Sequence, residues 1–257
     1  MPPPLRSILD HPAVSGRYLV PQSRKVNSPF YVDVPGARLA CHHQVVDPAN
    51  LTLVHFHGNG EAVADYVPSF TDACAHMQLN TLLVEYRGYG ASSGDAQLVA
   101  MLDDGLAAVQ TANLEWSRVL VFGRSIGSLY AVDLAARRPD IAGLILESGL
   151  ADPVERFLKY AKLEPVGLAA HDVVPDIQHF FNTQRKLEQY AGPLLLLHAE
   201  NDGLIEITHA EQNLAWSAST NKRLVRLPQG NHNTVMQLNW QAYQDAIAQF
   251  VQQITSA

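Results

Sequence analysis

The sequence predicts an α/β protein in which helices flank an eight-stranded, mostly parallel sheet. Of its 257 residues, 47% are hydrophobic and only 17% are charged, a composition typical of one large core and unlike that of disordered chains. Short apolar runs alternate with segments of helical period, as strands and crossover helices do in a parallel sheet. We therefore expect residues 1–257 to form a single domain.

The strands can be placed in order along the chain. Residues 30–34 and 39–46 are β-prone and flank the turn Pro35-Gly36-Ala37, which predicts an antiparallel pair. Six parallel strands are predicted at 51–56, 81–86, 118–122, 143–147, 193–198 and 223–227. Residues 1 to about 28 show no sustained period, and we expect them to form a surface arm.

Residues 150–191 are the long interruption between successive parallel strands. Loops longer than about 12–15 residues are usually functional or disordered, and this segment is too apolar for disorder. We expect a small helical cap whose Phe157, Phe180 and Phe181 line an acyl pocket. The alternative is a set of extra helices that only patch the edge of the sheet.

Charge and cysteine content exclude several classes of protein. The net charge of −7 leaves no broad basic surface for nucleic acid or anionic lipid. No apolar stretch reaches the roughly 18 residues of a spanning helix, and the start lacks a secretory signal, so we expect a cytoplasmic protein. Cys41 and Cys74 are too few for a zinc site and are expected to be reduced.

The motif Gly123-Arg124-Ser125-Ile126-Gly127 follows an apolar strand and precedes a helical pattern. This arrangement predicts a nucleophile elbow, a sharp turn that lifts the serine hydroxyl out of the sheet. Glycines are needed two residues before and after the serine if the turn is to close. Ser125 is therefore the predicted nucleophile of an acyl-transfer reaction.

A serine nucleophile needs a histidine base and an acid, which follow it in the chain in this topology. His232 lies in a Gly/Asn loop after the last strand, and Asp202 lies in a turn after the preceding one. We expect these two residues to complete a triad with Ser125. Glu200 and Glu147 remain alternative acids, because each also follows a strand of the sheet.

The predicted oxyanion hole consists of the backbone N–H groups of Ile126, directly after the serine, and of Asn59, in the glycine turn after the third strand. His57 in the same turn is expected to brace it. His55 and the pair His42-His43 are expected to be ordinary strand residues, because a zinc site would need three or four convergent ligands.

Five motifs together resemble serine hydrolases of the α/β-hydrolase fold: HGNG at 57–60, EYRGYGASSG at 85–94, GRSIG at 123–127, AENDGLI at 199–205 and GNHN at 230–233. The resemblance runs from about residue 29 to the C-terminus and is closest to small esterases, thioesterases and monoacylglycerol-lipase-like members. It implies that Arg87-Gly88-Tyr89-Gly90 is a bracing turn. Many relatives carry aspartate where this chain has Glu85, which leaves the local bracing open.

These motifs predict a serine hydrolase that cleaves a carboxylic ester or thioester of a small or medium acyl substrate through an acyl-enzyme, with no metal or organic cofactor. Amide or peptide hydrolysis is the alternative, although peptidases of this fold usually carry an added domain. A non-catalytic binding protein on the same fold is a further alternative. The sequence does not predict the oligomeric state.

Overall fold

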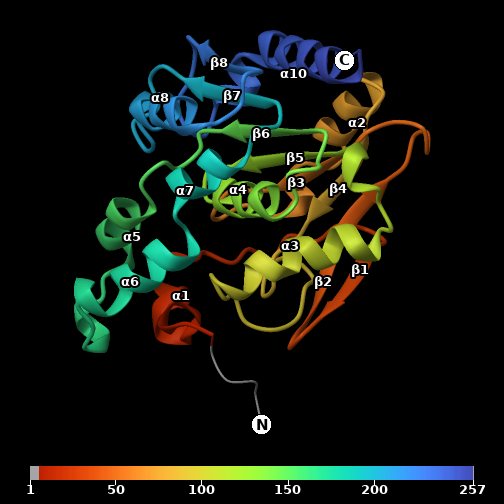
Figure 1. Cartoon of the computed structure of the whole chain (residues 1–257). Coiled ribbons are helices and arrows are strands. Elements are labelled where there is room, and N and C mark those ends of the chain that lie inside the picture. Colours follow the sequence, from red (N-terminus) through yellow and green to blue (C-terminus); the bar gives the residue numbers. More distant parts are fainter. Residues whose placement is uncertain (1–5, 257) are drawn as a thin grey trace.

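The computed structural model describes residues 6–256 and contains one eight-stranded sheet (Figure 1). Its strands follow the order β1-β2-β4-β3-β5-β6-β7-β8, and only the pairs β1–β2 and β2–β4 are antiparallel. The strands are β1 (Phe30–Val34), β2 (Ala37–Gln44), β3 (Thr52–Phe56), β4 (Asn80–Val84), β5 (Val119–Arg124), β6 (Gly143–Glu147), β7 (Leu194–Ala199) and β8 (Lys222–Leu227). The predicted fold class is confirmed.

Helices cover both faces of this sheet. The α-helices are α1 (Pro12–Tyr18), α2 (Ser69–His76), α3 (Ala100–Thr111), α4 (Gly127–Arg137), α5 (Pro153–Ala161), α6 (Ala170–Phe180), α7 (Thr183–Gln189), α8 (Ile207–Trp216), α9 (Val235–Leu238) and α10 (Trp240–Thr255). Short 3₁₀ helices are η1 (Ile8–Asp10), η2 (Val63–Asp65), η3 (Trp116–Arg118) and η4 (Glu164–Val166). Helices α3, α4, α7 and α8 pack on one face, and α2 and α10 pack on the other.

The central strands are buried on both faces, which explains their continuous apolar runs. Successive side chains of a strand point to opposite faces, so each strand contributes to two cores. Val121 of β5 lies in the larger core under α3 and α4, while its neighbours Leu120 and Phe122 lie in the core under α2 and α10. This alternation holds the sheet between the two helix layers.

The N-terminal segment is not the predicted surface arm. Leu9, Val14 and Leu19 are buried in the larger core, and the ring of Tyr18 lies 4.9 Å from that of Phe157. Three apolar residues spaced five apart match neither a helical nor a strand period, because a short 3₁₀ helix, a turn and a two-turn helix bring them to one side. The prediction is therefore wrong for residues 6–19, and residues 1–5 lie outside the described part of the chain.

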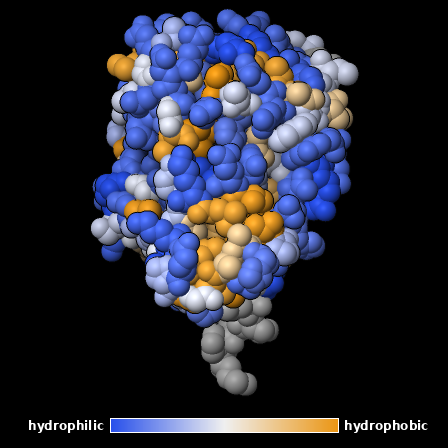
Figure 2. All heavy atoms as spheres, turned by 90° about the vertical axis from the view of Figure 1, so that its left-hand side faces the viewer, coloured by the Kyte–Doolittle hydropathy of each residue, from blue (hydrophilic) through white to orange (hydrophobic). Residues whose placement is uncertain are grey.

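The segment 150–191 is helical and consists of α5, η4, α6 and α7. Helix α7 packs on α4 and so belongs to the layer over the sheet. Helices α5 and α6 contact each other, and in addition α5 contacts α1 and α6 contacts η1. Figure 2 shows apolar side chains gathered at the height of α5 and α6 on a face that is otherwise mostly hydrophilic. Across residues 6–256, no helix combines the length and apolarity needed to cross a membrane.

We expect Leu9→Ala to lower the free energy of unfolding by about 2–4 kcal/mol, because it removes a fully buried side chain and leaves a cavity between η1 and the core. The matched control is Val45→Ala, at a position that is 51% exposed, with an expected change below about 0.5 kcal/mol. Urea unfolding of both variants measures the difference. Equal effects would mean that the N-terminal segment contributes no packing to the fold.

Candidate active site

Ser125 lies in a strained turn between β5 and α4, with φ at +53°, a left-handed conformation that is unfavourable for a residue with a side chain. The flanking glycines let this turn approach the neighbouring strand and helix closely. A Cβ at Gly127 would lie 2.1 Å from the carbonyl oxygen of Phe56, and one at Gly123 would lie 2.6 Å from Cβ of Ala131. The predicted need for glycine at both positions is confirmed.

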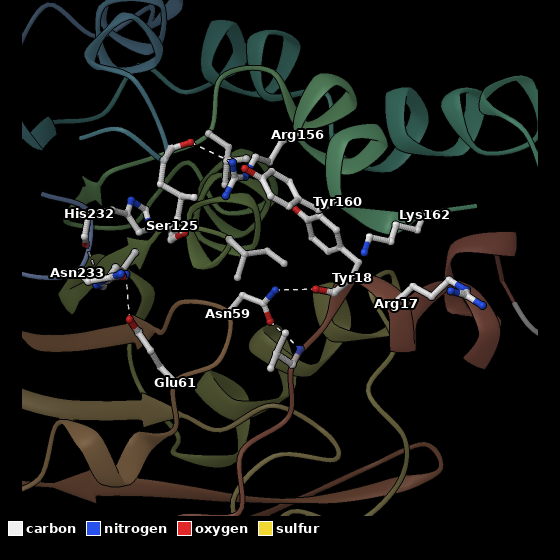
Figure 3. Close-up of a pocket in the computed structure, with 15 residues that line it drawn as sticks. Arg17, Tyr18, Asn59, Glu61, Ser125, Arg156, Tyr160, Lys162, His232 and Asn233 are labelled. Atoms are coloured by element: carbon white, nitrogen blue, oxygen red, sulfur yellow. Dashed lines mark hydrogen bonds and ion pairs between the residues drawn. The ribbon is translucent and has the colours of Figure 1, made fainter. Parts of the chain in front are cut away.

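The structure brings Ser125, His232 and Asp202 together from three loops at the carboxyl edge of the sheet. Figure 3 shows Ser125 beside His232. Oγ of Ser125 lies 3.0 Å from Nε2 of His232, and Nδ1 of His232 lies 2.8 Å from Oδ2 of Asp202. Because an ionised carboxylate only accepts hydrogen bonds, the proton of the imidazole belongs on Nδ1. Nε2 is then free to accept the hydrogen bond of the Ser125 hydroxyl.

Asp202 is buried and accepts four hydrogen bonds. Oδ2 accepts one from His232 and one from the Ser148 hydroxyl at 2.8 Å, while Oδ1 accepts the backbone N–H groups of Leu204 and Ile205. Burial alone would raise the pKa of Asp202, but these donors outweigh it and lower the pKa to about 2. The carboxylate is therefore held ionised against the imidazole.

The two alternative acids do not contact the His232 ring. The carboxylate of Glu147 is buried, forms an ion pair with Nε of Arg124 at 3.1 Å and accepts the Tyr243 hydroxyl. Burial raises the pKa of Glu147, and the neighbouring Arg124 opposes that shift. Glu200 is exposed on the surface. Among the three candidate acids, only Asp202 is placed to orient the base.

The amides predicted for the oxyanion hole border the cavity at Ser125. Within residues 6–256, the backbone N–H groups of Asn59 and Ile126 have no hydrogen-bond acceptor, so both can donate to a bound oxygen. The Asn59 side chain donates to the carbonyl of Tyr18 at 2.6 Å and accepts the N–H of Val20 at 2.8 Å. It thereby joins this loop to the end of α1.

His57 is fully buried behind this loop, where it braces the turn as predicted. Its Nδ1 lies 2.8 Å from the carbonyl oxygen of Gly58, and its Nε2 lies 2.8 Å from Oε1 of Glu85. Burial opposes a charge on this histidine, but Glu85, the Gly58 carbonyl and Glu61 together outweigh burial and raise the pKa of His57. Glu85 also accepts the N–H of Val63 and thereby braces this turn.

A cavity of about 450 Å³ opens beside Ser125 between the loops and the helices α1 and α5. The predicted lining residues Phe157, Phe180 and Phe181 do not border it, and that prediction is corrected here. Phe157 and Phe181 are buried in the larger core, and Phe180 packs against it. The lining is Arg17, Tyr18, Val20, Asn59, Glu61, Arg124, Ser125, Ile126, Leu150, Arg156, Tyr160, Lys162, Leu204, His232 and Asn233.

The sequence-based reasoning missed Arg124, which connects three loops of the site. Its buried guanidinium forms an ion pair with Glu61 at 2.9 Å and with Glu147 at 3.1 Å, and donates to the backbone carbonyl of His232 at 2.8 Å. Oε2 of Glu61 in turn accepts the N–H of Gly58 in the oxyanion loop. In the sequence, the only sign of this role is a charged residue at the end of an otherwise apolar strand.

Over residues 6–256, no three His, Cys, Asp or Glu side chains converge in a way that could hold a metal ion. Cys41 and Cys74 are both buried free thiols. Burial raises the pKa of each thiol to about 12, so neither is a ready nucleophile or metal ligand. The chemical groups that meet at the cavity are those of the serine site.

This chain is similar in sequence to a known family and to several known proteins. The family model described as serine aminopeptidase, S33 matches residues 47–179, more than half of the chain. The uncharacterized protein YfhR of Escherichia coli is 28% identical over 197 residues, covering 72% of this chain and 64% of that protein. Human alpha/beta hydrolase domain-containing protein 17B is 28% identical over 179 residues, covering 68% and 58%. The matched region is thus less than two thirds of the length of these curated relatives.

Solved structures with the same fold include an esterase and a protein with bound ferulic acid. Esterase Pf2001 of Pyrococcus furiosus superimposes with a TM-score of 0.69 and 18% identity, covering 91% of this chain and 99% of that one. Est1E of Butyrivibrio proteoclasticus, with ferulic acid bound, superimposes with a TM-score of 0.72 and 17% identity, covering 89% and 100%. At this identity the likeness establishes the fold.

The lowered pKa of Asp202 predicts a pH-dependent contribution to stability. Because the pKa falls from 3.8 to about 2 on folding, the ionised carboxylate stabilises the fold above about pH 4, and this contribution is lost as the pH falls toward 2. We expect Asp202→Asn to be less stable than the natural chain by about 2 kcal/mol at pH 7. The gap should narrow between about pH 4 and pH 2.

Urea unfolding at several pH values measures this gap. Asp95→Asn, at an exposed position, is the matched control and should change stability by less than about 0.5 kcal/mol at every pH. If the difference in stability between Asp202→Asn and the natural chain stayed constant down to about pH 2, this would contradict the stabilising role of the ionised carboxylate.

Proposed function

Since the chain belongs to the hydrolase family described as serine aminopeptidase, S33, we propose that it cleaves a carboxylic ester or thioester through Ser125, His232 and Asp202. The observation that carries this proposal is the continuous hydrogen-bonded path from Oγ of Ser125 through the His232 imidazole to the Asp202 carboxylate. Such a path lets one proton leave the nucleophile as it attacks.

In the proposed reaction, Ser125 attacks the carbonyl carbon of the acyl group while Nε2 of His232 takes the hydroxyl proton. The N–H groups of Asn59 and Ile126 donate to the oxygen that becomes negative. The protonated imidazole then gives its proton to the departing alcohol or thiol. Water, deprotonated by His232 in the same way, releases the acid from the acyl-enzyme and restores the serine.

Ester or thioester substrates fit the cavity better than the free amino terminus of a peptide. An aminopeptidase must bind an α-ammonium group, which needs a carboxylate or other acceptors at a fixed place. Among the described residues that line the cavity, the one carboxylate is Glu61, and it is already paired with Arg124. The description of one solved structure with this fold, Pf2001 of Pyrococcus furiosus, as an esterase agrees with the same choice.

We expect Ser125→Ala to keep the fold and to lower kcat for a p-nitrophenyl ester by several orders of magnitude, because the nucleophile is lost while the oxyanion donors remain. Steady-state hydrolysis by the purified variant measures the loss, and circular dichroism checks the fold. Undiminished turnover would remove Ser125 from the mechanism.

The acid is tested by neutralising Asp202 and, separately, the exposed alternative Glu200. Asp202→Asn should lower kcat by about a thousandfold or more, because the imidazole loses its orienting partner. Glu200→Gln is the matched control at an exposed position and should change kcat little. A mild effect of Asp202→Asn would mean that the acid has been misassigned.

A further inference from the structure

The cavity at Ser125 is positively charged, although the chain as a whole carries a net charge of −7. Four cationic side chains line it, against one carboxylate. The cationic residues are Arg17, Arg124, Arg156 and Lys162, and the carboxylate is that of Glu61. A local excess of one charge in a cleft of a protein of the opposite sign attracts ligands that complement the cleft.

Arg124 does not contribute to this excess, because Glu61 and Glu147 pair with it. The other three cations have no carboxylate within ion-pair distance among residues 6–256. Arg156 is linked to the site through Leu204, whose carbonyl accepts Nη1 of Arg156 and whose N–H donates to Oδ1 of Asp202. Arg156 is therefore the cation best placed to act on a group bound at the nucleophile.

Two contacts hold the guanidinium of Arg156 in place. It stacks over the ring of Tyr160, 3.9 Å from the ring centroid, and its Nη1 donates to the carbonyl of Leu204 at 3.0 Å. Nε and Nη2 have no acceptor among residues 6–256. A half-buried guanidinium that is fixed on one side and unpaired on the other can accept a planar anion at little cost in side-chain entropy.

The carboxylates near Arg156 do not form ion pairs with it. Asp152, Glu155 and Glu206 line a surface depression that Arg156 also borders, but among residues 6–256 none of them lies within 4.0 Å of its guanidinium nitrogens. Burial raises the pKa of Tyr18 to about 12, with Arg156 opposing that shift, so this phenol stays neutral at physiological pH. The unpaired edge of the Arg156 guanidinium is therefore available to pair with a bound anion.

We propose that the substrate cleaved at Ser125 carries an anionic group, such as a carboxylate, and that Arg156 binds it. The proposal rests on the proposed function and adds to it the chemical class of the substrate. Arg17 and Lys162, at the far end of the cavity, attract the same group by charge. Arg156 determines specificity and takes no part in the bond-making steps.

The test compares two pairs of esters that differ in one charge. In the first pair the charge is in the acyl part: p-nitrophenyl hydrogen adipate and its neutral methyl ester. In the second it is in the alcohol part: the butyrate ester of 4-hydroxyphenylacetic acid and that of its methyl ester. We expect kcat/KM to favour the charged member of at least one pair by about tenfold or more, the scale of one charge-assisted hydrogen bond.

Arg156→Gln should reduce this charged-to-neutral ratio about tenfold, and Arg156→Lys should restore part of it. Lys159→Gln is the matched control. Lys159 is a cation on the same helix, and its side chain does not border the cavity. That variant should leave the ratio within about twofold. In the natural chain, the ratio should also fall as NaCl rises from about 0.05 M to about 0.5 M, which tests the charge without any substitution.

Each other outcome overturns a defined claim. A ratio at or below one for both pairs, or a ratio unchanged in Arg156→Gln, would contradict the proposal of an anionic substrate but not the proposal that the protein is a serine hydrolase. Hydrolysis of none of the four esters, together with no reaction of Ser125 with a fluorophosphonate, removes the proposed function and this inference with it.

Discussion

The whole site depends on the close approach of the strained serine turn to strand β3. A side chain at Gly127 would collide with the backbone carbonyl of Phe56, so the first turn of α4 can lie against the end of β3 only with glycine there. That contact brings the turn of Ser125 beside the end of the strand that precedes the loop of Asn59. Ser125 adopts a positive φ in this turn, and its Oγ lies 3.0 Å from Nε2 of His232.

Arg124 holds the surrounding loops at this turn. At the end of β5, its buried guanidinium pairs with two carboxylates and also donates to the backbone of His232. Its partner Glu61 accepts the N–H of Gly58, so one guanidinium connects the segments that carry Ser125, His232 and Asn59. Because each ion of this buried network is paired, the desolvation cost of the charges is offset, and the loops are positioned by direct bonds.

The sheet and the three residues joined by hydrogen bonds were predictable from local pattern, since strands buried on both faces leave continuous apolar runs and each site residue follows a strand end. The burial of Leu9 and Val14 was not, because their spacing follows no single period. The lining of the cavity was also missed. Phe157 and Phe181 face the core because apolar rings gain more from burial there, and the neighbouring Arg156 and Tyr160 face the cavity instead.

The proposed role of Ser125 is tested most directly by mapping the residue that a fluorophosphonate modifies. The folded chain is treated with a fluorophosphonate, its intact mass is measured, and the modified peptide is mapped. We expect one adduct per chain, on Ser125. A chain that is unfolded before treatment should form no adduct, because the reactivity of the serine depends on the folded turn and on His232. Ester hydrolysis that persists without an adduct, or an adduct on another residue, would contradict this role of Ser125.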